Sequence, residues 1–354
     1  MKKLLPEPLD FIAHYPLLHY LRSMLVMPPK NTVAYSISPK STSILVTPRK
    51  GGVAVFSDNV AHVEGAPNAE VLDPSASDEN SFSSGGVYHK NVVRKYGLAR
   101  GGDAVLIIDH PRMYLNFHGM QGASVTISKV YEELARAPQS ILPGWQGGET
   151  YQWAAVTDRI DLAPEGAFAS TLQQVFLAGL PASLIDFICS WSAHSKQTLQ
   201  GIIPFPLAVA GWARRQYESE QMFHMVVPTT GAICVFTFSD VRCTHYFAPK
   251  NDNYAASEVA GAIEDVNSTV SDNPGDTPVY IWPTAGSDTE KLVQGIRQSG
   301  VRNAAVVSLQ SEGGLPFSPT ASLLEWALQN SLEGFGQIGS SLSSFDLPLA
   351  ENKT

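Results

Sequence analysis

The sequence has little charge. Asp, Glu, Lys and Arg make up 16% of its 354 residues, against about 25% in an average soluble protein. The shortage is greatest from Gly166 to Ala213, where Asp186 and Lys196 are the only formal charges. A helix that faces water normally carries a charged side. The composition therefore predicts that this stretch is buried against partners.

Positive charge is scarce in particular. The chain has 24 basic and 33 acidic residues, a formal net charge of -9, and its basic residues form no tail or arm. A protein that coats a polyanion needs clustered Lys and Arg to neutralise phosphates. The charge balance therefore leaves weak or non-specific contact with nucleic acid at most.

The sequence also has few cysteines and few long apolar runs. Three cysteines (Cys189, Cys234 and Cys243) are too few for a disulfide scaffold and favour a reducing compartment. Pro6 and Glu7 interrupt the apolar core that a signal peptide would need. The uncharged stretch 166–185 contains too many polar residues to insert into a bilayer. No membrane association is predicted.

Strand patterns dominate the first third of the chain. Alternating apolar residues predict short strands, joined in part as antiparallel hairpins, at 33–38, 43–47, 53–57, 104–109 and 112–117. Helices are predicted at 15–27 and 124–137. Three more are predicted within the charge-poor stretch, at 168–180, 182–194 and 207–218.

The last third contains clearer start and stop signals. Strands are predicted at 221–228, 232–239 and 241–247, followed by a helix at 253–266. Strand 278–282, a helix that starts with the capping box Ser287/Glu290 and ends at Gly300, and strand 301–309 predict one βαβ unit. Ser318 and Pro319 predict the start of a final helix.

These patterns predict a mixed, helix-rich α+β fold with short hairpins near the start and one βαβ unit near the end. The predicted regions are a strand-rich part (1–120), a charge-poor helical part (121–220) and a mixed α/β part (221–354).

Three motifs suggest chemistry, and each has a simpler structural explanation. Gly334, Gly336 and Gly339 match the dinucleotide-binding spacing, but they follow a helix instead of a strand, so we interpret them as a helix stop. Cys243 and His245, with His224 on another strand, could supply three metal ligands, yet a fourth is not evident. We therefore predict no cofactor and no metal.

The most enzyme-like cluster is Asp109 with His110, near Gly101, Gly102, Asp103 and His118. Catalytic groups often collect in loops after strands. Adjacent residues on a strand point to opposite faces, however, and no nucleophile elbow, P-loop or zinc helix completes a constellation. These residues are a candidate acid–base site, and no catalytic residue is assigned.

Two functions remain open. The first is a subunit that assembles with copies of itself into a large shell, as a virus capsid protein in a virion formed in the host cytoplasm. The acidic balance would suit a double-stranded RNA virus. The alternative is an oligomeric cytoplasmic α/β enzyme or ligand-binding protein. Its site would lie near Asp109–His118 or in the loop 311–317 after the βαβ unit.

Overall fold

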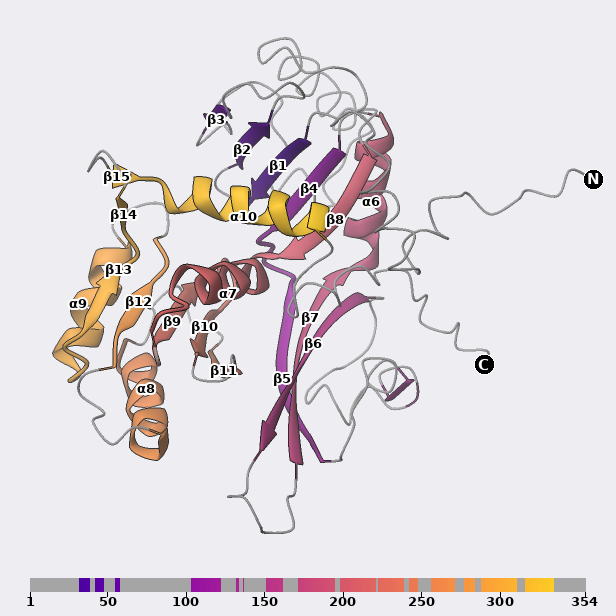
Figure 1. Cartoon of the computed structure of the whole chain (residues 1–354). Helices are drawn as coiled ribbons and strands as arrows, with labels where there is room; N and C mark the ends of the chain where they lie inside the picture. The colour runs from indigo at the N-terminus through magenta and orange to yellow at the C-terminus, as the bar shows by residue number, and fades with distance from the viewer. Residues whose placement is uncertain are drawn as a thin grey trace, which may run out of the picture.

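The structure is a computed structural model that describes residues 32–38, 42–47, 55–57, 103–121, 132–133, 136, 151–161, 171–194, 198–220, 222–238, 242–247, 256–270, 277–283, 288–310 and 316–333. Figure 1 shows the arrangement of its elements. The strands are β1 (Thr32–Ile37), β2 (Thr42–Thr47), β3 (Val55–Ser57), β4 (Asp103–Ile108), β5 (Tyr114–Gln121), β6 (Tyr151–Asp161), β7 (Thr171–Pro181), β8 (Thr198–Pro204), β9 (His224–Pro228), β10 (Ile233–Thr237), β11 (Arg242–Phe247), β12 (Val279–Ile281), β13 (Ala304–Val306), β14 (Leu309–Gln310) and β15 (Pro316–Phe317). The helices are α6 (Ala182–His194), α7 (Phe205–Gln216), α8 (Ala256–Val270), α9 (Asp288–Gln298) and α10 (Pro319–Glu333).

Two five-stranded sheets share one topology. The first has the order β3-β2-β1-β4-β8 and the second has the order β11-β10-β9-β12-β13. In each, the first three strands in sequence form an antiparallel meander. The fourth strand pairs in parallel with the first, and the fifth pairs in parallel with the fourth. We call the first sheet with α6 lobe I, and the second sheet with α8 and α9 lobe II.

Side chains alternate between the two faces of each sheet, as the two-residue repeat of a strand requires. In lobe I, Tyr35 and Leu106 face a core shared with Leu184 of α6. In lobe II, Val226 and Ile281 face a core shared with α8 and α9. Each sheet therefore has one face covered by helices of its own lobe.

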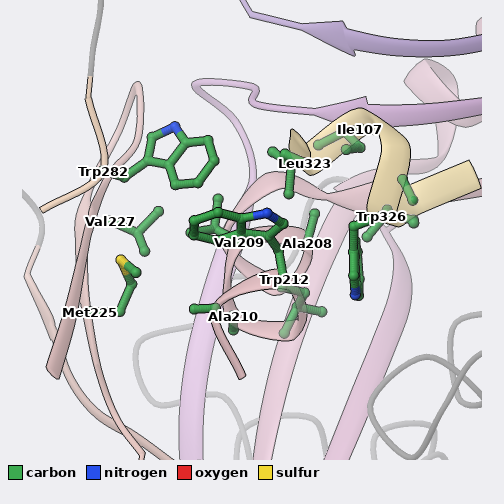
Figure 2. Packing of buried hydrophobic residues seen from close by; sticks show 14 of the residues in the cluster. Ile107, Ala208, Val209, Ala210, Trp212, Met225, Val227, Trp282, Leu323 and Trp326 are labelled. Atoms are coloured by element: carbon green, nitrogen blue, oxygen red, sulfur yellow. The ribbon is translucent and has the colours of Figure 1, made fainter. Parts of the chain in front are cut away.

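The opposite faces of both sheets contribute to a single core around α7 and α10. Helix α10 contacts β1, β2, β4 and α7, whereas α7 also contacts β8 and β9. Figure 2 shows Val209 and Trp212 of α7 between Met225 and Trp282 on the lobe II side and Leu323 of α10 on the other. The two lobes are thus joined by helices that are buried between them (Figure 1).

Trp212 connects the elements of this shared core. Its indole lies edge-on to Trp282, with ring centroids 5.1 Å apart. Its Nε1–H donates to Ser322 Oγ of α10 at 3.0 Å. Because a buried indole needs a partner for its N–H, this bond fixes α7 against α10 at one rotation.

Two smaller sheets complete the described part of the chain. Strands β5, β7 and β6 form an antiparallel sheet in that order, and β14 pairs with β15. Strand β11 of lobe II contacts β5 and β7. The three-stranded sheet therefore lies beside lobe II while β7 leads directly into α6 of lobe I (Figure 1).

The α+β class is confirmed, and so are the parallel strands of the βαβ unit formed by β12, α9 and β13. Gly300 ends α9 with a φ of 113°. The bonds from Gly300 N–H to Arg297 O and from Val301 N–H to Ile296 O close a Schellman motif. Ser318 Oγ accepts from the N–H of Ala321, as expected of a helix N-cap.

One predicted helix is wrong, because residues 171–181 form strand β7. Every residue of β7 pairs with β6 on one side, and most also pair with β5 on the other. A central strand that is apolar on both faces shows no alternation, so its pattern resembles that of a buried helix. Strands β6 and β8 were also missed.

Several predictions lie outside the described residues, namely the helix at 15–27, Ser287 of the capping box, and Gly334, Gly336 and Gly339. Of the helix predicted at 124–137, the described residues 132, 133 and 136 are helical. The predicted division at residues 120 and 220 stays a prediction. Within the described ranges, no helix combines the length and apolarity needed to cross a bilayer.

Candidate functional site

The carboxyl ends of the central strands of the two lobes meet at one junction. In each sheet the chain leaves the first strand toward the meander on one side and returns as a parallel strand on the other, which makes the β1/β4 and β9/β12 positions topological switch points. Ligands of open α/β sheets bind outside the carboxyl ends of strands at such points. Asp109 follows β4 and Thr230 follows β9 at this junction.

The carboxylate of Asp109 binds Thr230 across the two lobes. Its Oδ2 accepts from the Thr230 hydroxyl at 2.8 Å and from the Thr230 main-chain N–H at 3.0 Å. Its Oδ1 lies 3.1 Å from the same nitrogen. A turn that supplies an N–H and a hydroxyl to one carboxylate holds an anion by charge-assisted hydrogen bonds. The arrangement is thus a small anion site that the chain itself fills.

Both sides of this contact are braced. The N–H of Asp109 donates to Ile37 O at 2.9 Å, which extends the β1–β4 pairing by one bond. On the other side, the Thr229 hydroxyl donates to Ala232 O and accepts from Ala232 N–H, closing the β9–β10 turn. A Cβ on Gly231 would lie 3.2 Å from Pro111 O. The glycine therefore allows the two segments to approach closely.

The loop after β4 is held by its own residues. His110 is buried, and its Nδ1 accepts from the N–H of Arg112 at 3.1 Å, while its carbonyl accepts from the N–H of Met113. The Tyr151 hydroxyl of β6 donates to Arg112 O at 3.0 Å. His110 thus shapes the loop that presents Asp109, instead of acting as its catalytic partner.

Burial raises the pKa of Asp109 to about 6, although the hydrogen bonds from the Thr230 N–H and hydroxyl act in the opposite direction. Desolvation therefore outweighs the two donors. The carboxylate is mostly ionised at neutral pH, but it is held less favourably than an exposed one.

The structure does not bring Asp103 and His118 to Asp109, and Gly101 and Gly102 lie outside the described residues. Asp103 lies at the opposite end of β4 from Asp109, about 17–20 Å away for a strand of this length. Its Oδ1 is buried and has no hydrogen-bond partner among the described residues. His118 pairs through its backbone with Val175, inside the β5-β7-β6 sheet. An acid–base site built from these residues is not formed.

His224 lies on β9 and the other two candidate metal ligands lie on β11, two strands away in the same sheet. Its Nδ1 bonds with the Thr237 hydroxyl at 3.0 Å and its Nε2 bonds with Asn267 Oδ1 at 2.8 Å. Burial lowers the pKa of His224, so the ring is neutral at pH 7. Both ring nitrogens are occupied in linking β9, β10 and α8. Within the described ranges, no three His, Cys, Asp or Glu side chains form a metal-binding group.

A recess of about 330 Å³ opens between α7 and α10, away from Asp109 and Thr230. Trp212 and Trp326 line it together with polar side chains. Across it, Arg215 donates to Gln329 Oε1 at 2.9 Å. The recess marks where the two connecting helices diverge toward solvent.

Sequence reasoning identified Asp109 but missed Thr230. The Thr-Thr-Gly turn between two apolar strands was visible as a hairpin connection. Its pairing with a carboxylate 121 residues away depends on the docking of the two lobes. The loop 311–317 of the alternative site lies mostly outside the described residues.

The sequence matches no protein-family model and no curated protein. Its structure is similar to a Bacteroides thetaiotaomicron protein of unknown function with an actin-like ATPase fold, at 12% identity and a TM-score of 0.46, covering 84% of this chain and 96% of that one. It is also similar to the PilM–PilN type IV pilus biogenesis complex, at 10% identity and a TM-score of 0.48, covering 89% and 98%. A third similar structure is the AlfA filament from a Bacillus subtilis plasmid, at 9% identity and a TM-score of 0.34, covering 85% and 98%.

The prediction of a capsid protein in a virion is wrong. The similar structures named above are an actin-like ATPase-fold protein, a pilus biogenesis complex and a filament, and none of these three is a capsid protein. The low charge that prompted the prediction also has another cause, because α7 is buried within a single chain. Self-association is compatible with these similar structures, but a large shell and contact with nucleic acid are not supported.

Proposed function

We propose that this protein is a two-lobed binding protein that takes a phosphate-bearing small molecule between the carboxyl ends of β4 and β9. The observation that carries the proposal is the anion site at Thr230, which already holds a carboxylate. A phosphate oxygen needs the same donors as a carboxylate oxygen. The ligand would therefore enter where Asp109 now binds.

The surrounding architecture supports this location. The strand ends that flank the site belong to two sheets of the same order, so a ligand there would contact both lobes at once. Helices α7 and α10 connect the lobes behind the site and can act as a hinge. A ligand that contacts both lobes would favour the arrangement in which they are closed.

ATP is the first ligand to test, because the similar Bacteroides thetaiotaomicron protein is described as having an actin-like ATPase fold. ADP and inorganic phosphate separate recognition of the phosphates from recognition of the nucleoside. We expect the protein in the cytoplasm. Association between copies stays a prediction that sedimentation of the same samples can measure.

The test is isothermal titration of the wild type, Asp109→Ala and Asp109→Ala/Thr230→Val with ATP, ADP and inorganic phosphate, because Asp109 otherwise occupies the donors of Thr230. We expect saturable ATP binding by the wild type and by Asp109→Ala. Adding Thr230→Val to Asp109→Ala should weaken binding about 10-fold, because one hydrogen bond to a charged group is lost. Thr320→Val on α10, remote from the junction, is the matched control and should bind like the wild type. Failure of all three ligands to bind, or equal affinities of Asp109→Ala with and without Thr230→Val, would refute the proposal.

A further inference from the structure

In the described structure, Asp109 takes the N–H and hydroxyl of Thr230 that a ligand would need. Three close contacts of 2.8–3.1 Å join the two residues. Thr230 itself is exposed, so water or a solute could reach its donors if the carboxylate moved. The chain thus supplies its own anion to the site.

This contact also ties the two lobes together beside the start of α7, because Pro204, the residue before α7, pairs with Ile108 next to Asp109. Asp109 is anchored to β1 through its N–H, and Thr230 sits in a turn closed by Thr229 and Ala232. Because the backbone on each side is held by its own sheet, separation of the lobes at the junction would break the contact. Rotation of the Asp109 side chain would also break it.

Two effects act on the Asp109–Thr230 contact in opposite directions. Charge-assisted hydrogen bonds contribute more than neutral ones, and they favour the closed arrangement. Partial burial of the carboxylate opposes them, because it removes the charge from water.

We propose that Asp109 is an autoinhibitory latch: it holds the lobes closed in the ligand-free protein and must leave Thr230 before a phosphate-bearing ligand can bind. The latch rests on the proposed ligand site for its role, but its effect on the lobes can be measured without ligand. Removal of the carboxylate should loosen the lobes and raise the affinity for the ligand, because a competitor has gone.

The experiment measures the distance between the lobes by fluorescence transfer in the full-length protein. One dye is attached to Cys189, exposed on α6, and the other to a cysteine introduced by Gln294→Cys on the exposed side of α9, in a Cys243→Ser background. Asp109→Ala should give a longer and broader distance distribution without ligand, and about 10-fold tighter ATP binding by titration. Glu258→Ala, which removes an exposed carboxylate from α8, is the control and should change neither.

The possible outcomes distinguish the latch proposal from the proposal that the protein binds a phosphate-bearing ligand. Opening of Asp109→Ala with tighter ATP binding supports both proposals. If the lobes of Asp109→Ala open but no variant binds ATP, the latch proposal stands and the proposed ligand is refuted. An unchanged distance in a folded Asp109→Ala protein overturns the latch, whatever ATP does. If Asp109→Ala does not fold, Thr230→Val removes the hydroxyl donor from the other side and should open the lobes to a smaller degree, and no opening in that variant overturns the latch.

Discussion

Val209→Glu is expected to leave no stable folded protein. Val209 is 0% exposed in the core between the two lobes, with Met225 and Val227 on one side and Leu323 on the other (Figure 2). A carboxylate there would be unpaired and surrounded by apolar side chains. Such burial costs more than about 4 kcal/mol, a large share of the 5–15 kcal/mol that typically stabilises a domain. Urea unfolding followed by circular dichroism measures the loss.

Gln216→Glu is the matched control, because it adds the same charge to the exposed end of the same helix. A negative charge in the last turn opposes the helix dipole slightly. We expect its free energy of unfolding to stay within about 1 kcal/mol of the wild-type value. Similar stability of the two variants would show that α7 does not lie between the lobes.

Gly211→Ala should destabilise the protein, although alanine favours helices. A Cβ at residue 211 would overlap Cζ2 of Trp326 and lie 2.7 Å from its Cη2. The ring is packed between α7 and α10, so a helix or the ring has to move. Overpacking of this kind costs about 1–3 kcal/mol, which exceeds the gain of up to about 1 kcal/mol in helix propensity.

Gly261→Ala provides the opposite case within the same protein. Gly261 lies in α8, and a Cβ there would meet no atom within 4 Å. The same substitution should raise the free energy of unfolding by about 0.5–1 kcal/mol, because only the propensity term remains. The account of the α7–α10 contact requires the two glycines to respond with opposite signs in chemical denaturation. A gain in stability from both substitutions would be inconsistent with it.

Local signals in the sequence predicted most elements of the last third of the chain. Gly300 and the Ser318-Pro319 pair marked a helix end and a helix start, because their conformational and hydrogen-bonding needs are set within a few residues. The parallel pairing of β12 with β13 followed from the length of the helical connection between them.

The charge-poor middle was misjudged because burial alone does not reveal what covers a segment. Residues 206–213 of α7 are all buried, and the cover is provided by sheets whose strands lie far away in the sequence. The same missing charges would arise from burial against another subunit. For residues 206–213 the pattern therefore predicted burial correctly, but not the intramolecular partner.

The candidate site was predicted only in part for the same reason. Asp109 was predicted as a candidate site residue because it follows a buried strand, which is a local feature. Thr230 belongs to an ordinary hairpin turn and gains its role only when lobe II docks on lobe I. The repeated sheet topology that defines the junction also leaves no sequence repeat by which it could be found.

The central claim is that a phosphate-bearing ligand replaces Asp109 at Thr230 between the two lobes. Hydrogen exchange of the segments 109–113 and 229–232, followed by mass spectrometry with and without millimolar ATP, tests it most directly. We predict that ATP changes exchange in both segments together, with slower exchange in the 229–232 turn because the ligand binds its N–H groups. Identical exchange in both segments with and without ATP would contradict the claim.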